Sequence, residues 1–185
     1  MIQGGFFGKI LRVDLSAGSI TTWNMPENYA ADFLGGRGLG ARILYEENPA
    51  HVEPYSPENR LIFFTSPLMG TTAPCCVKLS LVTKSPLSGT ILMSFAGGFF
   101  GPELKKAGYD GIVIQGRAKD PVYLQIVDDE VEIVDASHLW RRKTSDTQAH
   151  LRSSFGSEKV KTLCIGPAGE NLVRFAGVFS DNHAF

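Results

Sequence analysis

Apolar and polar residues alternate along the start of the chain with a period of two, the pattern of half-buried β-strands. The alternation covers residues 9–15, stops at 16–18, and resumes at 20–23, which predicts a β-hairpin over 9–23. Helical patterns bounded by proline or glycine follow at 26–34 and 39–47. The later pattern predicts these further elements: strands at 61–64, 77–84, 90–93, 111–114, 160–165 and 172–179, a short helix from 102, a hairpin at 122–134, and a helix at 145–156.

A glycine pair, Gly97-Gly98, separates the predicted strand 90–93 from the short helix that begins at Pro102. A strand that runs through glycines into a helix start presents backbone N–H groups to an anion. Glycine also permits close approach of a ligand to the backbone. A tight turn needed for packing explains the same residues, so the pattern alone leaves both interpretations open.

The run Gly36-Arg37-Gly38-Leu39-Gly40-Ala41 has the letters of a dinucleotide-binding fingerprint. That fingerprint requires a buried strand before it, whereas a helix is predicted here. We interpret the run as a closely packed corner between two helices.

The order of predicted elements repeats along the chain. Each half contains a hairpin, one or more helices, a buried strand, a proline- and glycine-containing loop, and another strand. The sequence therefore predicts an α+β fold made of an internally duplicated unit, with repeats of about 1–110 and 111–185. Such a duplication would place the loops that contain Pro67 and Pro167 together beside the glycine pair.

Composition excludes several classes of protein. The 185 residues are 43% hydrophobic and carry a net charge of -1 without a basic block, which argues against nucleic-acid binding. Three cysteines without a Cys-x-x-Cys motif predict neither a disulfide framework nor a metal or iron–sulfur site in this chain. No apolar run reaches the length of a membrane span, and the N-terminus lacks the pattern of a signal peptide, so we expect a cytoplasmic protein without a membrane contact.

Several motifs together resemble one family, the N-terminal domain of the tungsten-containing aldehyde ferredoxin oxidoreductases, over essentially the whole chain. The motifs are Gly8-Lys9-Ile10-Leu11-Arg12-Val13-Asp14-Leu15, Phe33-Leu34-Gly35-Gly36-Arg37-Gly38-Leu39-Gly40, Ser56-Pro57-Glu58-Asn59, Thr83-Lys84-Ser85-Pro86-Leu87-Ser88-Gly89, Gly97-Gly98-Phe99-Phe100-Gly101-Pro102-Glu103-Leu104-Lys105, Ala107-Gly108-Tyr109-Asp110 and Ile165-Gly166-Pro167-Ala168-Gly169-Glu170-Asn171-Leu172-Val173.

This resemblance implies a duplicated α+β domain that forms the base for a tungsten or molybdenum ion held by two pterin dithiolenes, with a magnesium ion bridging the pterin phosphates. It implies oxidation of aldehydes to carboxylates with electrons passed to ferredoxin. A [4Fe–4S] cluster is expected in later domains of the family. In such enzymes the cofactor carries the chemistry and the protein holds and tunes it.

The resemblance also implies which residues meet the cofactor. They are Lys78, where the family has an arginine, and the run Phe95, Ala96, Gly97 and Gly98, in which Phe95 replaces an asparagine. A lysine keeps the charge of the arginine but loses its forked grip on phosphate. The backbone carbonyl at position 95 is expected to face the magnesium ion. We assign no catalytic residue and no metal-ligating side chain to this chain.

The family continues beyond Asp181-Asn182-His183 with an arginine and a glycine-rich loop, whereas this sequence reads Ala184-Phe185. We therefore expect the remaining domains or a partner subunit to be needed, and this chain alone to be inactive. An excised domain, a truncated product and one subunit of a split enzyme all remain open, as does the substrate.

An open sheet edge predicts self-association. The alternative function is a non-catalytic scaffold or relic that keeps the fold without the cofactor.

Overall fold

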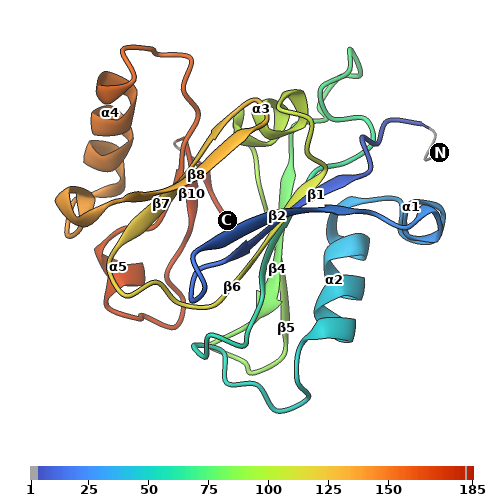
Figure 1. Cartoon of the computed structure of the whole chain (residues 1–185), viewed down its shortest axis with the longest axis horizontal. Helices are drawn as coiled ribbons and strands as arrows, with labels where there is room; N and C mark the ends of the chain where they lie inside the picture. Colours follow the sequence, from blue (N-terminus) through green and yellow to red (C-terminus); the bar gives the residue numbers. More distant parts are fainter. Residues whose placement is uncertain (1–3, 182) are drawn as a thin grey trace.

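The computed structural model describes residues 4–181 and 183–185. Asn182 and the N-terminal Met1-Ile2-Gln3, which entered the sequence predictions, lie outside this part of the chain. A six-stranded mixed sheet with the order β2-β1-β6-β3-β4-β5 organises the structure (Figure 1). β1 and β6 are parallel and the other pairs are antiparallel. Its strands are β1 (Lys9–Asp14), β2 (Ser19–Asn24), β3 (Leu61–Phe64), β4 (Leu79–Lys84), β5 (Ile91–Ala96) and β6 (Gly111–Gln115).

The central strands bury side chains on both faces of this sheet, which explains their nearly continuous apolar sequences. On β3, Ile62 and Phe64 belong to one core cluster and Phe63 to the other. On β4, Val82 joins the first cluster, whereas Leu79 and Leu81 join the second. The sheet is therefore the middle layer of the molecule.

Helix α2 (Gly36–Glu47) covers the first face, together with the shorter α1 (Glu27–Phe33). Leu39, Ile43 and Leu44 of α2 pack against the strands. The contact is close at Gly40, where an added Cβ would lie 2.7 Å from Cγ2 of Val82. Gly40 is thus required by the approach of helix to sheet. The predicted close corner between two helices is at Gly38 instead, where an added Cβ would lie 2.7 Å from the carbonyl oxygen of Phe33 in α1.

We expect Gly40→Ala to destabilise the protein by about 1–3 kcal/mol, the usual cost of overpacking. The steric conflict with Val82 should outweigh the gain of about 1 kcal/mol in helix propensity. Thermal unfolding of Gly40→Ala, Val82→Ala and the double variant measures the effect. The double variant should be more stable than the sum of the two single losses predicts, and simple additivity would contradict the contact.

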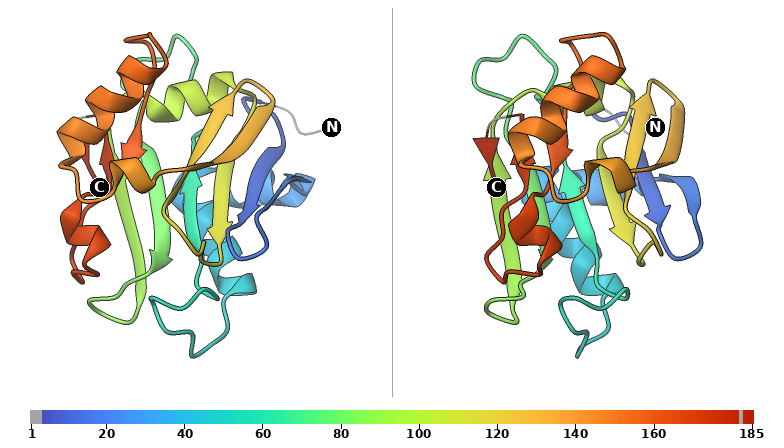
Figure 2. Two further views of the ribbon diagram at one scale, coloured as in Figure 1. Left: turned by 60° about the vertical axis from the view of Figure 1, so that its left-hand side comes forward. Right: turned by 90° about the vertical axis from the view of Figure 1, so that its left-hand side faces the viewer.

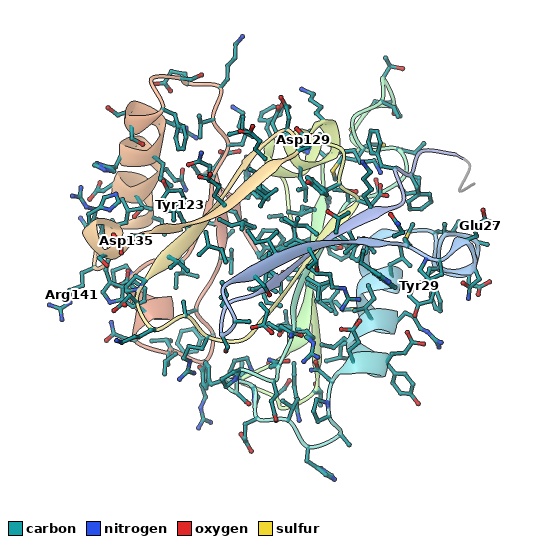
Figure 3. All side chains as sticks on the ribbon, viewed as in Figure 1. Glu27, Tyr29, Tyr123, Asp129, Asp135 and Arg141 are labelled. Atoms are coloured by element: carbon teal, nitrogen blue, oxygen red, sulfur yellow. The ribbon has the colours of Figure 1, made fainter. Side chains whose placement is uncertain are left out.

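The second face is covered by later parts of the chain (Figure 2). A separate hairpin, β7 (Val122–Val127) and β8 (Glu130–Asp135), packs there, and Phe185 contacts Phe63 edge-on. Asp128 and Asp129 form the hairpin turn, as predicted, with Asp129 labelled in Figure 3. The other elements are α3 (Phe100–Lys106), η1 (Ser137–Leu139), α4 (Thr144–Ser154), β9 (Leu163–Cys164), α5 (Pro167–Glu170), β10 (Phe179–Ser180) and β11 (His183–Ala184). Within the described part of the chain, no helix has the length and apolar character needed to cross a membrane.

The C-terminal third differs from the sequence prediction. The strands predicted at 160–165 and 172–179 are reduced to two residues each, in the small sheet β11-β10-β9. The helix predicted from Ser145 begins one residue earlier, and no side chain caps it, although Ser145 and Gln148 have the spacing of a capping box. Gln148 instead is buried, with its amide 3.9 Å from the sulfur of Cys164.

The α+β fold class is confirmed, but the internal duplication is not. β6, the first strand of the predicted second repeat, lies between β1 and β3 of the first repeat, so the boundary near 110 cuts through one sheet. The proline loops are also not brought together. The loop after β3 and helix α5, which begins with Pro167, lie at different ends of the molecule (Figures 1 and 2). The predicted floor of two matched loops is therefore wrong.

Candidate functional site

The predicted cofactor residues gather where β4 begins and β5 ends, here named the glycine-pair end of the sheet. Leu79 pairs with Ala96 across these strands, so Lys78 and Gly97 lie at the same end. Ala96 is buried, with 2% of its surface exposed, while Lys78 is exposed. The start of α2 reaches the same place, since Gly36 donates a hydrogen bond to the carbonyl of Thr65 just beyond β3.

One face at this end carries both side chains of the predicted set. Phe95 pairs with Ser80 and therefore points to the same face of the sheet. Strand alternation places Lys78, two residues before Ser80, on that face as well. Phe95 is 42% exposed, and the guanidinium carbon of Arg37 lies 5.9 Å from the centre of its ring. The helix start thus adds Arg37, which lies outside the predicted set, to Lys78 and Phe95.

Gly97 and Gly98 have different surroundings. Gly98 has a φ of +88°, and an added Cβ would lie 3.1 Å from Oγ and 3.2 Å from the carbonyl oxygen of Ser180. At Gly97 φ is not in the left-handed region, and an added Cβ would meet nothing nearer than the His183 ring at 4.0 Å. Packing and backbone conformation therefore require glycine at position 98 but not at 97.

This difference predicts opposite outcomes for two adjacent substitutions. Gly97→Ala should change the unfolding free energy by less than about 0.5 kcal/mol, because the site has room and ordinary backbone geometry. Gly98→Ala should cost about 1–3 kcal/mol, because alanine is strained at positive φ and crowds Ser180. Denaturant unfolding of both variants tests the prediction, and equal losses would contradict it.

The sequence predicts that the backbone N–H groups at the start of α3 face an anion. In the structure, the N–H of Phe99, just before α3, donates to the carboxylate of Asp181 in the same chain. Asp181 accepts a hydrogen bond from the backbone N–H of Phe99 at 3.2 Å through Oδ2. Its Oδ1 accepts from Arg152 at 3.1 Å and from the N–H of Thr162 at 3.2 Å. The helix begins at Phe100, two residues before the predicted Pro102. This contact fixes the C-terminal segment against the glycine pair.

The cysteines and histidines do not form a metal centre in the described residues, where no group of three or more metal-ligating side chains is found. Cys75 and Cys76 are free thiols in the loop before Lys78. Cys164 on β9 is partly buried, and burial raises the pKa of its thiol, which disfavours the nucleophilic thiolate.

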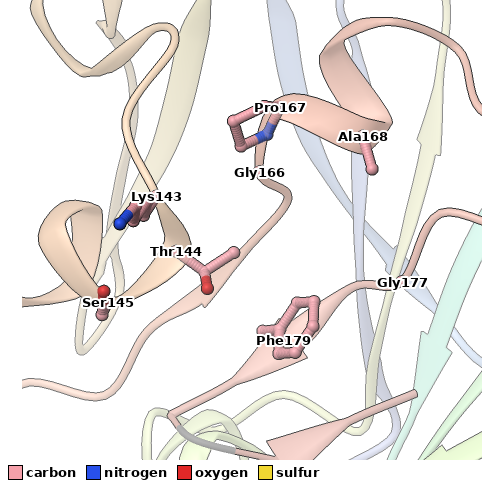
Figure 4. A pocket seen from close by; sticks show the side chains of 8 residues that line it. All are labelled: Lys143, Thr144, Ser145, Gly166, Pro167, Ala168, Gly177 and Phe179. Carbon is pink, nitrogen blue, oxygen red and sulfur yellow. The ribbon is translucent and has the colours of Figure 1, made fainter.

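An open pocket of ≈ 360 Å³ lies elsewhere, between the start of α4 and the start of α5 (Figure 4). It contains the loop residues Gly166, Pro167 and Ala168 that were expected beside the glycine pair. Tyr55, in the loop that follows the C-terminal end of α2, donates a hydrogen bond to the carbonyl of Leu172 just after α5. None of the five predicted cofactor residues lines this pocket, although Phe179, which does, directly precedes the Ser180 that lies against Gly98.

The structure brings together all five predicted residues and adds Arg37, Ser180 and Asp181. The signal for Arg37 was present in the Gly36-Arg37-Gly38 motif, but only the pairing of β5 with β4 shows that this helix start faces Phe95. Ser180 and Asp181 are more than 80 residues from the glycine pair in sequence, and no local pattern connects them.

Comparison with known proteins identifies the family. Residues 10–185 match the family described as "Aldehyde ferredoxin oxidoreductase, N-terminal domain". The tungsten-containing aldehyde ferredoxin oxidoreductases of Pyrococcus furiosus and Pyrococcus abyssi are 51% and 49% identical over 97% of this chain, which spans 30% of each relative. A solved structure of the active-site complex BamBC of benzoyl coenzyme A reductase with 1,5-dienoyl-CoA matches with a TM-score of 0.96 and 38% identity, over 99% of this chain and 28% of that one. The chain belongs to the aldehyde ferredoxin oxidoreductase N-terminal domain family.

Proposed function

We propose that this chain is the cofactor-holding part of a tungsten- or molybdenum-dependent oxidoreductase. Lys78 and the backbone of Phe95, Ala96, Gly97 and Gly98 would contact a pterin cofactor there. The observation that carries the proposal is the bare backbone at Gly97, where neither φ nor packing requires glycine. A residue that lacks a side chain without a structural reason leaves room for a ligand against the main chain.

The residues present fit a phosphate-bearing cofactor. Lys78 and Arg37 supply positive charge on the same face, and no carboxylate of the described residues lies within ion-pair distance of either. Their charges are therefore available to an external anion. The backbone carbonyl of Phe95 would help to hold the magnesium ion that the family resemblance implies. When bound, the cofactor supplies the two-electron redox chemistry.

The role of this chain is to bind and orient, and we assign no proton transfer to it. By analogy with the relatives named as aldehyde ferredoxin oxidoreductases, the reaction would be oxidation of an aldehyde to a carboxylate, with electrons passed to ferredoxin. The solved relative that acts on a coenzyme A thioester shows that the same fold accompanies a substrate other than a simple aldehyde. A [4Fe–4S] cluster and the substrate pocket would come from polypeptide outside this chain. The comparisons do not favour the alternative of a scaffold without cofactor.

The remaining polypeptide of the enzyme is the proposed main partner. β5 is an edge strand of the six-stranded sheet, and it leads into the glycine pair. Its side chains Ile91, Met93 and Phe95 are each more than 40% exposed and share one face. An edge strand with exposed apolar side chains and no charge is a favourable surface for binding another polypeptide. In the isolated chain the same surface would support self-association, which analytical ultracentrifugation over a wide concentration range would detect.

Substitution of Lys78 in the native protein tests the proposal. Protein carrying Lys78→Ala, purified anaerobically with any co-purifying subunits, should contain about tenfold less pterin and metal than the unsubstituted protein, the loss expected for one charged hydrogen bond. Lys119→Ala is the matched control, since Lys119 is also exposed and follows β6 at the other end of the sheet. Equal cofactor contents in the two variants would contradict the role of Lys78.

A further inference from the structure

We infer that Arg37 supplies the forked phosphate grip that Lys78 cannot supply, so that Arg37 and Lys78 clamp one phosphoryl group of the cofactor between them. The inference rests on the proposed function and names a further binding residue for that site. Three structural observations carry it: the position of Arg37 against Phe95, the shared face of Lys78, and the lack of a carboxylate partner for either cation among the described residues.

The aromatic ring of Phe95 supports the Arg37 side chain from below its guanidinium group. The guanidinium carbon lies 5.9 Å from the ring centre, within the range of a cation–π contact. A guanidinium held over an aromatic face keeps its N–H groups directed outward and can bind a phosphate with two parallel hydrogen bonds. The exposed Phe95 therefore has a role as an apolar support, although a polar residue was expected at this position.

Arg37 and Lys78 approach the ring of Phe95 from two separate elements. Arg37 stands in the first turn of α2, and an added Cβ on the preceding Gly36 would lie 3.9 Å from Oγ of Ser80. Lys78 precedes β4 by one residue and shares the face of Ser80 and Phe95. The two cations therefore flank one patch of the sheet, with Phe95 across the strand pair.

Some other arginines of the chain pair with carboxylates, whereas Arg117, Arg141, Arg142 and Arg174 form no such pair in the described residues. Arg12 pairs with Glu47, Arg42 with Glu46, and Arg152 with Asp181. In the described residues no such carboxylate meets Arg37 or Lys78, even though acidic residues slightly outnumber basic ones in the sequence. Two exposed cations on one face have no counter-charge among the described residues, so an anion bound between them would interact favourably with both. A bound phosphoryl group would supply that anion.

The test measures binding of inorganic pyrophosphate to the full 185-residue chain by ³¹P NMR titration, which requires neither metal nor turnover. Arg37→Ala and Lys78→Ala should each weaken binding about tenfold, the effect of one charged hydrogen bond at a solvent-accessible site. Arg37→Lys, which keeps the charge but removes the fork, should weaken binding about threefold. Arg174→Ala, which removes an exposed arginine after α5, is the matched control and should bind as the unsubstituted chain does.

Two results would overturn the clamp. One is an unsubstituted chain that does not bind pyrophosphate, and the other is an Arg37→Ala variant that binds as tightly as Arg174→Ala. Binding by Arg37→Lys equal to that of the unsubstituted chain would overturn the forked grip in particular. Each of these results leaves the proposed function standing, because pterin and metal content of the native protein test that separately. A chain that binds pyrophosphate through Arg37 and Lys78, yet is isolated without pterin, would instead contradict the proposed function.

Discussion

Asp110→Asn should lower the stability of this protein by about 3–5 kcal/mol, because it leaves a buried lysine charge without its partner. Asp110 is 1% exposed and accepts a hydrogen bond from the buried Lys105. It also accepts from the backbone N–H groups of Phe7 at 3.2 Å and Gly8 at 2.6 Å. At 2–4 °C per kcal/mol for a chain of this length, the melting temperature should fall by about 10 °C.

The control for this prediction is a neighbouring pair on the surface. Glu103 and Lys106 form an exposed ion pair on the same helix as Lys105, so Glu103→Gln should cost less than about 1 kcal/mol. The double variant Lys105→Met with Asp110→Asn should regain much of the lost stability, since no unpaired charge remains buried. A loss for Asp110→Asn no larger than that for Glu103→Gln would contradict the account.

Asp181→Asn should release the C-terminal segment from the glycine pair and cost about 2–3 kcal/mol. The carboxylate of Asp181 accepts from the N–H groups of Phe99 and Thr162 and pairs with Arg152. An amide cannot accept all of these hydrogen bonds, because its nitrogen is a donor. Hydrogen exchange at the amides of Phe99 and Thr162 should therefore accelerate more than exchange in the central strands.

Asp128→Asn is the matched control, because Asp128 also has a positive φ but lies in an exposed hairpin turn. Asparagine tolerates that backbone conformation, so neither substitution introduces strain. The control should change stability by less than about 0.5 kcal/mol. If Asp181→Asn left exchange at Phe99 unchanged, the proposed tie between the C-terminal segment and the glycine pair would be wrong.

Much of the six-stranded sheet could be predicted from the sequence because its signals are local. The alternation over 9–23 appears as β1 and β2, and the apolar run 61–64 appears as β3. The strand predicted at 90–93 extends to Ala96 as the outer strand β5, because pairing with β4 continues to Leu79. Of the segment predicted as a strand at 172–179, only Phe179 pairs with neighbouring strands, and residues without a strand partner do not form a strand.

The candidate site was predicted only in part. Lys78 and the run 95–98 came from the family resemblance, and they share one end of the sheet. Arg37 and Asp181 could not be assigned to it from sequence, because their relation to Phe95 and Phe99 depends on tertiary contacts across 58 and 82 residues. The predicted duplication is not confirmed, because repeated element order does not specify strand pairing and β6 joins the sheet formed by the first strands.

The central claim is that this chain holds a tungsten or molybdenum pterin cofactor. Elemental analysis of the protein purified anaerobically from its native organism, combined with pterin determination on the same sample, tests it most directly. We predict tungsten or molybdenum in stoichiometric amount together with pterin, on the chain itself or on a complex that contains it. Well-folded protein with neither metal and no pterin would contradict the claim and leave the chain as a scaffold of this family.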